Sequence, residues 1–446
     1  MNPQAVLEDA GMTSAAARAK RELFDELHQS GQGAALHAWF VPGRIEVLGK
    51  HTDYAGGRSL LCAVERGICL TASARDDDQV VVRDVGRDVS LAVALDPELA
   101  VPATGWANYV ATVARRVARN FPRARRGADI FFASDLPSSS GMSSSSALIT
   151  SVFLVLADVN ALRYAPDTEA IFQRCEDLAT YASTVENGRG FGVFAGDRGV
   201  GTAGGSEDHT AILCSRAGLL SQFSFCPARL ERRVALDAAL AFVVGVSGIS
   251  ASKTGAARER YNAAAAATTR MLDLWRENTG RDDRVLADAL ASAPDAVDRL
   301  RDLVIRADGG VSDGALLGRF EQFLEESQSL VPSAAERLAE RNYTAFGEIV
   351  ARSQSFAERQ LGNQVPETRA LAASARDLGA VAASAFGAGF GGSVWALVPA
   401  DEAAAFTARW SEHYRHTFPE AGGRAQFFVT RPGPPATRID SNATGS

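Results

Sequence analysis

The sequence predicts an α+β protein with two lobes. A chain of 446 residues is longer than the roughly 250–300 residues at which a single hydrophobic core stops growing. Its early part carries several short apolar runs typical of strands, whereas its second half has mainly helical periodicity. We therefore expect an N-terminal lobe at residues 1–215, a C-terminal lobe at residues 216–438 and a tail at residues 439–446.

The N-terminal lobe is predicted to begin with a helix and continue as a mixed sheet. Ser14–Gln29 has helical periodicity and runs into Gly31, which suits a helix C-cap. The expected strands are Leu36–Val41, Ile45–Leu48, Gly67–Ala74, Val80–Val85 and Val89–Leu95. The next expected elements are a helix at Trp106–Phe121, a strand at Asp129–Ala133, and helices at Ser144–Val159 and Asp167–Val185.

A glycine-rich stretch, Asn187–Gly205, separates these elements from further strands. Those strands are expected at Thr210–Cys214, Leu219–Phe225 and Leu240–Val246. The helices expected after them are Lys253–Asn278, Asp283–Ala291, Gly314–Glu326, Ser333–Leu338, Tyr343–Leu361 and Glu367–Leu378. A strand, a glycine loop and a second strand are expected within Ala382–Val398, followed by a last helix and the strand Ala425–Val429.

Composition limits the partners. The hydrophobic fraction of 46% and the charged fraction of 22% are ordinary for a globular protein, and no apolar run approaches the roughly 20 residues of a membrane helix. Acids stand where a signal peptide carries basic residues, so a cytoplasmic location is expected. The net charge of −7 argues against nucleic acid as a partner. The oligomeric state stays open between monomer and dimer.

The cysteines and one cluster of arginines have ordinary structural interpretations. The five cysteines are scattered, without a C-x-x-C pair, and are expected to be reduced core thiols. One basic cluster is predicted to end a helix on its solvated face, and it consists of Arg115, Arg116, Arg119, Arg123, Arg125 and Arg126.

A serine-rich segment, the serine loop (Asp135–Ala147), lies between a predicted strand and a predicted apolar helix. Its small residues let backbone N–H groups close around phosphate oxygens, and the helix N-terminus adds a positive dipole. Hydroxyl groups can donate to phosphate or bind Mg²⁺. A flexible linker would not run straight into the core helix that begins near Leu148. The segment therefore predicts a phosphate site, although it lacks the Walker A pattern.

A second informative segment, the polar loop (Lys50–Gly57), follows a predicted strand that ends at Gly49. It places Lys50, His51, Asp53 and Tyr54 on one loop closed by glycines. Such a concentration of polar groups suits the recognition of hydroxyl groups. A surface turn with incidental charges is the alternative.

These two segments resemble motifs of the GHMP kinase superfamily, and of its galactokinase members in particular. The sequence Gly43-Arg-Ile-Glu-Val-Leu-Gly-Lys-His-Thr-Asp-Tyr-Ala-Gly-Gly57 resembles the galactokinase signature G-R-V-N-L-I-G-E-H-T-D-Y-N-G-G. The serine loop resembles the second motif, P-x-x-x-G-L-x-S-S-A, through Pro137, Gly141, Met142, Ser144 and Ser145, with Ser146 where the pattern has Ala. The resemblance implies a fold with an N-terminal lobe like ribosomal protein S5, a C-terminal α/β lobe and an active site between them.

One departure concerns the acceptor. Lys50 stands where the signature has Glu, and an ammonium donates hydrogen bonds where a carboxylate accepts them. A lysine would suit a carboxylate on the substrate, so a uronic acid becomes a rival to galactose. Alternatively, Lys50 pairs with an acid of the protein such as Glu46.

A third motif, the glycine loop (Gly387–Gly392), invites two interpretations. Its glycines spell G-x-G-x-x-G, but a dinucleotide fingerprint must open a helix, whereas Ser393–Val398 has the character of a strand. A plain hairpin is another alternative. The motif resembles the C-terminal GHMP loop G-A-G-F-G-G, which implies that Gly389 and Gly391 lie against the phosphate pocket.

The resemblance assigns the remaining roles. It implies that Arg44 and Asp208 are catalytic, and that Lys50, His51, Asp53, Tyr54 and Tyr261 bind substrate. For ATP it implies Pro137, Ser140, Gly141, Met142, Ser143, Ser144 and Ser145, with Ser144, Ser145 and Glu186 as ligands of Mg²⁺. Asp208 stands in a segment, Gly204–Thr210, that could also be an ordinary acidic turn.

The implied function is ATP-dependent phosphorylation of a sugar hydroxyl, most simply C1 of galactose or a related sugar. The partners would be ATP, Mg²⁺ and a small sugar. The alternatives are a kinase for an acidic sugar such as galacturonate, and a galactokinase-like sugar sensor without catalysis. The intact serine loop and Asp208 argue against the sensor.

Overall fold

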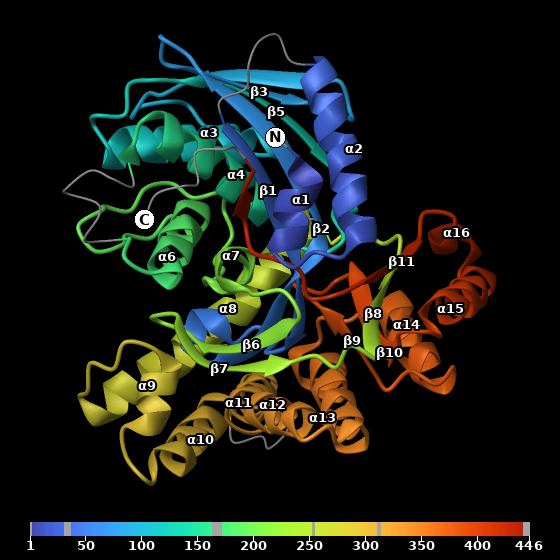
Figure 1. Ribbon diagram of the computed structural model, residues 1–446. Helices are drawn as coiled ribbons and strands as arrows, with labels where there is room; N and C mark the ends of the chain where they lie inside the picture. The colour runs from blue at the N-terminus through green and yellow to red at the C-terminus, as the bar shows by residue number, and fades with distance from the viewer. Residues whose placement is uncertain (1, 31–36, 163–171, 252–254, 310–313, 440–446) are drawn as a thin grey trace.

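The computed structural model describes residues 2–30, 37–162, 172–251, 255–309 and 314–439, and it is built around two β-sheets (Figure 1). The larger sheet has eight strands, and six of them follow the order β12-β1-β2-β5-β3-β4. The other two, β6 and β7, extend this sheet from one end of β2. The smaller sheet has the order β11-β8-β10-β9.

Strands of the larger sheet are antiparallel except for the parallel pair β3 and β5. The sheet is mixed, as the sequence predicts, and its two longest strands, β1 and β2, carry the polar loop between them. The strands are β1 (His37–Leu48), β2 (Arg58–Ala74), β3 (Gln79–Asp84), β4 (Val89–Ala94), β5 (Ala128–Ser134), β6 (Leu219–Ser224), β7 (Arg229–Ala235) and β12 (Thr437–Arg438).

Helices cover both faces of this sheet because its side chains alternate between two cores. Phe40 and Cys69 belong to a core that includes side chains of α2, whereas Val41 and Leu70 belong to the main core, which includes side chains of α4. The helices of this part are α1 (Pro3–Asp9), α2 (Ser14–Ser30), α3 (Trp106–Asn120), α4 (Ser144–Val159), α6 (Cys175–Asn187) and α7 (Glu207–Cys214).

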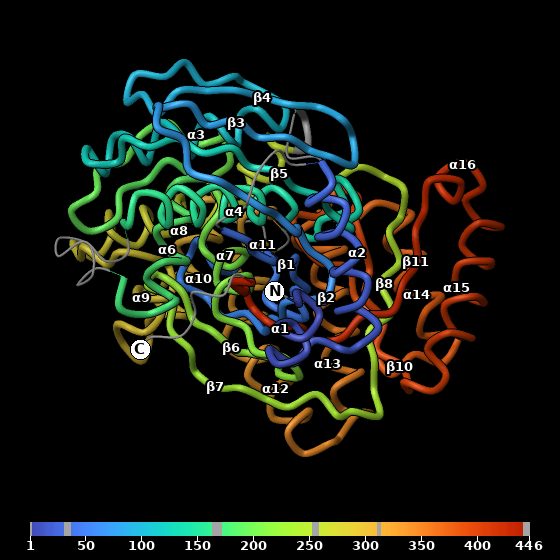
Figure 2. The backbone as a smooth tube through the Cα atoms, turned by 45° about the horizontal axis from the view of Figure 1, so that its top comes forward, coloured from blue at the N-terminus to red at the C-terminus, as the bar shows by residue number. Residues whose placement is uncertain are grey.

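The second half contributes the four-stranded antiparallel sheet and a helical region. Figure 2 shows α14, α15 and α16 at the right edge of the molecule, whereas β3 and β4 lie at the top. The strands are β8 (Leu240–Val246), β9 (Ala382–Phe386), β10 (Ser393–Pro399) and β11 (Gln426–Thr430). The helices are α8 (Gly255–Thr279), α9 (Leu286–Ala291), α10 (Ala296–Ala307), α11 (Ala315–Glu325), α12 (Val331–Ala339), α13 (Tyr343–Phe356), α14 (Pro366–Asp377), α15 (Ala403–Thr417) and α16 (Pro419–Gly422). Short one-turn elements are η1 (Asp53–Ala55), η3 (Glu326–Leu330) and η4 (Ala357–Leu361).

One predicted strand is wrong. Thr210–Cys214 belongs to the helix α7, which begins at Glu207. Its apolar run is too short to distinguish a strand from one face of a helix, and Glu207 and Asp208 suit a helix N-terminus, where the dipole is positive. The correction matters because Asp208 therefore lies on a helical first turn. Of the helix expected at Asp167–Val185, residues 167–171 lie outside the described residues, and α6 begins at Cys175.

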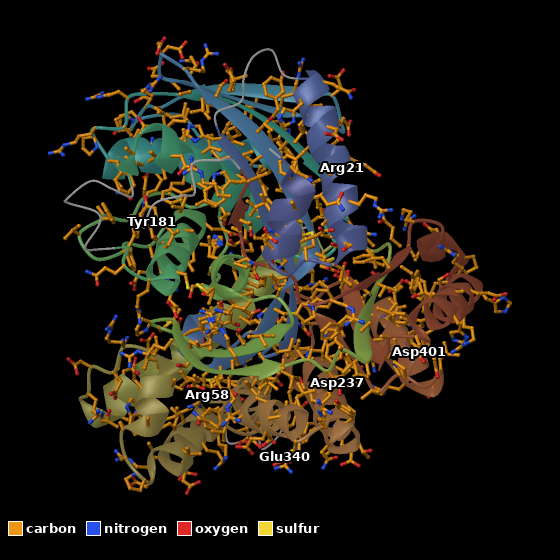
Figure 3. All side chains as sticks on the ribbon, viewed as in Figure 1. Arg21, Arg58, Tyr181, Asp237, Glu340 and Asp401 are labelled. Atoms are coloured by element: carbon orange, nitrogen blue, oxygen red, sulfur yellow. The ribbon has the colours of Figure 1, made fainter. Side chains whose placement is uncertain are left out.

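The chain crosses between the lobes more than once. β6 and β7 follow residue 215 in sequence, yet they pair with β2 of the larger sheet. Arg58 of β2, which is labelled in Figure 3, forms an ion pair with Glu231 of β7 at this junction. The division at residues 215 and 216 stays a prediction, and the tail lies almost entirely outside the described residues.

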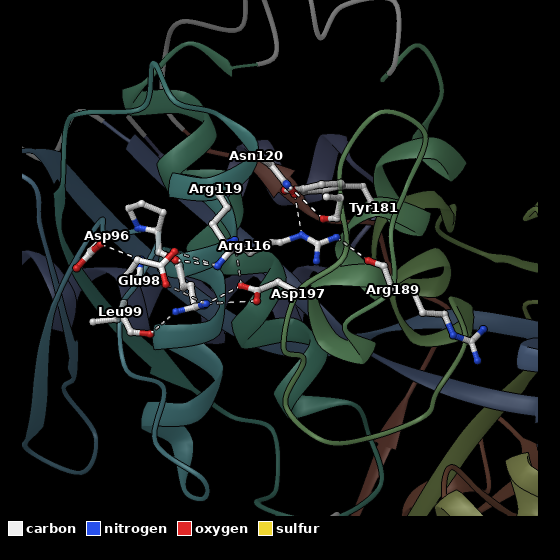
Figure 4. A network of polar contacts seen from close by, with 12 residues as sticks. Asp96, Glu98, Leu99, Arg116, Arg119, Asn120, Tyr181, Arg189 and Asp197 are labelled. Atoms are coloured by element: carbon white, nitrogen blue, oxygen red, sulfur yellow. Dashed lines mark hydrogen bonds and ion pairs between the residues drawn. The ribbon is translucent and has the colours of Figure 1, made fainter.

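The basic cluster is not simply solvated. Arg116 is buried, and it donates to Asn120 and to the carbonyl of Arg189 (Figure 4). Arg119 lies near Glu98 and Asp197, so acids of the protein neutralise this helix face locally (Figure 4). Among the helices that the structure describes, none combines the length and the apolar character needed to cross a bilayer.

Candidate active site

The centre of the site is a contact between Arg44 and Asp208. β1 carries Arg44 and the first turn of α7 carries Asp208, so 163 intervening residues fold to bring them together. The Arg44 Nε and Nη2 atoms lie 2.8 and 2.7 Å from Asp208 Oδ1. Arg44 Nη1 also donates to the carbonyl of Gly141 in the serine loop. Burial opposes the charge of Arg44, but Asp208, Glu207 and Glu46 together raise its pKa above the usual value.

Two pockets meet at this ion pair, and both are lined by Arg44, Asp208 and Ala388. The smaller pocket is strongly acidic. Besides these three residues it is lined by Glu46, His51, Asp53, Ser183, Glu186, Asn187, Thr202, Gly204, Gly205, Glu207, Tyr261 and Gly387.

The polar loop supplies His51 and Asp53 to the wall of the smaller pocket. Asp53 is buried and accepts a hydrogen bond from the backbone N–H of Glu207, at 3.1 Å. His51 has a left-handed backbone, with φ of 58°, and its ring contacts the Tyr54 hydroxyl and the carbonyl of Ala388. Tyr261 packs against the His51 ring, with ring centroids 5.0 Å apart. Tyr54 does not line the pocket, and burial raises its pKa to about 12.

Lys50 lies behind this wall. Its side chain is 1% exposed and lines neither of the two pockets. Its Nζ lies 3.1 Å from Ser353 Oγ of α13, and that hydroxyl donates to Glu326 at 2.8 Å. Glu326 also accepts from the backbone N–H of Gly49, at 2.8 Å. The lysine therefore ties the start of the polar loop to the helices beneath it.

The larger pocket has a volume of about 750 Å³ and lies over the N-terminus of α4. Pro137, Gly141, Ser143, Ser144 and Ser145 of the serine loop line it. The lining also includes Trp106 and Tyr109 from the start of α3, together with Arg66 and Arg87. Aromatic rings, cations and a helix N-terminus in one cavity suit a purine base carrying phosphates.

Backbone geometry in the serine loop opens it toward this pocket. Gly141 and Ser143 adopt φ values of 77° and 62°, so the chain turns sharply into α4. Ser143 Oγ is buried and has no hydrogen-bond partner among the described residues. Ser140 and Met142 are also buried but do not line the pocket, and the Ser140 hydroxyl donates to the carbonyl of Pro137.

The glycine loop packs against the serine loop and joins β9 to β10 in an antiparallel pair. The strand after Gly392 excludes a dinucleotide-binding helix there. Ser393 Oγ donates to the carbonyl of Ser140 at 2.7 Å, and a Cβ on Gly387 would lie 2.7 Å from the carbonyl of Gly141. Gly389 and Gly391 pack against Asn363 and Ile249 rather than lining either pocket.

The predicted metal ligands divide between the pockets. Ser144 and Ser145 line the larger pocket, whereas Glu186 lines the smaller one. Ser146 connects the two, since its Oγ lies 2.8 Å from Glu186 Oε2 and 3.3 Å from Asp208 Oδ2. Hydroxyl and carboxylate oxygens are the donors that Mg²⁺ prefers, so this set fits the ion.

Sequence reasoning did not assign Glu46, Glu207, Trp106 or Tyr109 to the pockets, and it named Glu46 only as a possible partner of Lys50. Glu46 stands two residues after Arg44 on β1, and strand alternation puts both side chains on one face. That spacing was a usable signal. Glu207 directly precedes Asp208, but only the helical start of α7 turns both toward Arg44. The signal for Trp106 and Tyr109 was weaker because aromatic residues at a helix start are usually part of a core.

Three family models match this chain in order. Residues 22–74 match the galactokinase galactose-binding signature, residues 108–195 match the N-terminal domain of GHMP kinases, and residues 334–416 match their C-terminal domain. These segments contain the polar loop and Arg44, the serine loop and Glu186, and α13 with Ser353.

Known relatives agree with these models. The galactokinase of Actinobacillus pleuropneumoniae is 36% identical over 119 residues, which are 27% of this chain and 31% of that protein. The galactokinase of Exiguobacterium sibiricum is 32% identical over 201 residues, which are 44% of this chain and 45% of that protein. The chain thus matches between about a third and a half of the length of these curated relatives.

Solved structures extend the likeness to the whole fold. The Lactococcus lactis galactokinase complexed with galactose is 23% identical, with a TM-score of 0.73 over 90% of this chain and 94% of that chain. The L. major mevalonate kinase complexed with R-mevalonate is 13% identical, with a TM-score of 0.54 over 90% and 97% of the two chains. The predicted two-lobed α+β fold is therefore confirmed. From the three ordered family matches and this shared fold, the chain belongs to the GHMP kinase superfamily.

Proposed function

We propose that this protein is an ATP-dependent sugar kinase that transfers the γ-phosphate to a hydroxyl of galactose or a related neutral sugar. The observation that carries the proposal is the position of Arg44 and Asp208 on the shared wall of the two pockets. A kinase needs its phosphate donor and its acceptor to meet at one point, with charge compensation there.

The larger pocket would hold the nucleotide. The base would lie against Trp106 and Tyr109, and the phosphates would lie at the N-terminus of α4, where backbone N–H groups and the serine hydroxyls donate to them. Ser143 Oγ could donate a hydrogen bond to a phosphate oxygen, because it has no partner among the described residues. Mg²⁺ would be held by Ser144, Ser145 and Glu186, and when bound it would offset negative charge on the phosphates.

The smaller pocket would hold the sugar. Asp53, His51 and Tyr261 would bind hydroxyl groups and one face of the ring. Asp208 would accept the proton of the reacting hydroxyl or orient that hydroxyl toward the phosphate. Arg44 would favour the ionised hydroxyl and offset charge that spreads over the transferring group. The likeness to galactokinases makes the anomeric hydroxyl the expected acceptor. We also propose that the two lobes divide between residues 215 and 216.

ADP release measured with a panel of sugars tests this proposal. The panel is galactose, arabinose, N-acetylgalactosamine, galacturonate and glucuronate. We expect release with a neutral galactose-like sugar and the product phosphorylated at C1. Binding of ATP and sugar without any ADP release would instead support the sensor, and absence of binding to both would contradict the proposal.

A further inference from the structure

Glu46 is an acid that the proposed mechanism leaves without a role. Its side chain is 3% exposed, it lines the smaller pocket, and its Oε1 has no hydrogen-bond partner among the described residues. A buried acceptor without a donor lowers stability, so such an atom in a binding pocket points to a ligand that supplies the donor.

Lys50 explains how this carboxyl can be kept there. The lysine contacts Ser353, away from the pocket. Burial raises the pKa of Glu46, and the positive charge of Lys50 opposes that rise. Glu326, which accepts a hydrogen bond from Ser353 Oγ, offsets the positive charge of the lysine. An acid at position 46 and a base at position 50 thus form a unit in which the acid faces the pocket and the base supports it.

The rest of the pocket is also rich in acidic side chains. Glu46, Asp53, Glu186, Glu207 and Asp208 all line it, and Arg44 is the one Arg or Lys among the residues that the structure places in its lining. Glu207 forms a side-chain hydrogen bond with Glu46, and its own Oε2 accepts from Ser59 Oγ at 2.8 Å, while Glu46 Oε1 has no partner among the described residues. An ionised carboxylate on the acceptor has no hydrogen-bond donor to offer Glu46 Oε1, whereas a hydroxyl would supply the missing donor.

We propose that Glu46 is the specificity-determining residue for the acceptor, accepting a hydrogen bond from one hydroxyl of a neutral sugar, and that Lys50 is a positioning residue that never contacts it. This inference rests on the proposed kinase function. It gives the lysine at the signature position a structural role, and it excludes uronic acids as preferred acceptors.

The test compares Glu46→Gln with Lys50→Met on galactose, on its monodeoxy analogues and on galacturonate. For Glu46→Gln we expect kcat/KM with galactose to fall by on the order of 10- to 100-fold, because an amide accepts more weakly than a carboxylate. The loss should vanish on the single deoxy analogue that lacks the contacted hydroxyl. Lys50→Met should lower the melting temperature while leaving the order of preference among acceptors unchanged.

Each outcome decides something. If Glu46→Gln lowers kcat/KM equally on every analogue, or if the unsubstituted protein prefers galacturonate to galactose, the role of Glu46 is overturned. A reversal of sugar preference in Lys50→Met would overturn the role of Lys50. If the unsubstituted protein binds sugar without releasing ADP, the kinase function fails but the same comparison made on calorimetric affinities still tests Glu46. Absence of sugar binding altogether overturns both.

Discussion

Asp208 Oδ1 lies 2.7 Å from Nη2 and 2.8 Å from Nε of Arg44, and this one ion pair forms part of the walls of both pockets. Arg44 is 4% exposed while Asp208 is 18% exposed, so the arginine is fixed and the carboxylate can reach a ligand. The Gly141 carbonyl holds the third nitrogen of the same guanidinium. The serine loop, α7 and β1 are thereby joined at one point.

Asp208→Asn should lower kcat by at least about 100-fold, since an amide cannot accept the hydroxyl proton. Nucleotide affinity should stay close to that of the unsubstituted protein because the serine loop is unchanged. ADP release and calorimetric titration with ATP measure the two quantities, and Asp401→Asn at an exposed site is the matched control. Full turnover by the Asp208 variant would remove it from the mechanism.

Arg44→Lys should also be severely impaired, although it keeps the charge. A single ammonium cannot contact Asp208 through two nitrogens and the Gly141 carbonyl through a third. We expect kcat to fall on the order of 100-fold. Arg21→Lys, where the arginine is 45% exposed, is the control. A lysine variant within a few fold of normal activity would show that charge alone suffices.

Ser143→Ala should separate binding from folding. The Ser143 hydroxyl has no partner among the described residues, so its loss should leave the melting temperature nearly unchanged. ATP should bind roughly 10-fold more weakly if the hydroxyl donates to a phosphate. Ser140→Ala should show the opposite pattern, because its hydroxyl already donates to the Pro137 carbonyl. Equal ATP affinity in the Ser143 variant would exclude that contact.

Glu46 predicts a dependence of stability on pH. Burial raises the pKa of this carboxyl to about 7 from an ordinary value of 4.5, against the pull of Lys50 and Arg44. Between these values the folded protein binds more protons than the unfolded chain, so its stability decreases as pH rises from 4.5 to 7. The difference between the pKa of 4.5 and the raised pKa of about 7 corresponds to roughly 3 kcal/mol of folding free energy.

Glu46→Gln should flatten this slope, as measured by urea unfolding at several pH values. Burial, Glu46 and Asp53 also raise the pKa of Glu207, so some slope should remain in the variant. A slope unchanged by the substitution would place the titration elsewhere.

The sequence predicted the elements whose local and tertiary preferences agree. The helix at Ser144–Val159 was predicted with its observed bounds because its apolar run is long and the serines mark its start. α7 was mistaken for a strand because eight residues with a short apolar run carry no clear period. α1, β7, α10 and β12 were not predicted, and β7 alternates little because most of its side chains are exposed or half-buried.

The site likewise contains residues that the sequence predicted and residues whose positions it could not predict. Motif order predicted that Arg44, Asp208, His51 and Asp53 would converge, and the structure brings them together around one pocket. The direction of Lys50 could not be predicted, because it depends on Ser353 and Glu326 about 300 residues further on. Contacts of that kind are set by how distant helices pack beneath the loop rather than by any local pattern.

A crystal structure with galactose and a non-hydrolysable ATP analogue bound together would show directly whether both ligands meet at the Arg44–Asp208 pair. We expect the analogue's phosphates at the start of α4, the sugar between Asp53 and Tyr261, and the reacting hydroxyl within hydrogen-bond distance of Asp208. Phosphates or sugar bound away from the Arg44–Asp208 pair would contradict this expectation.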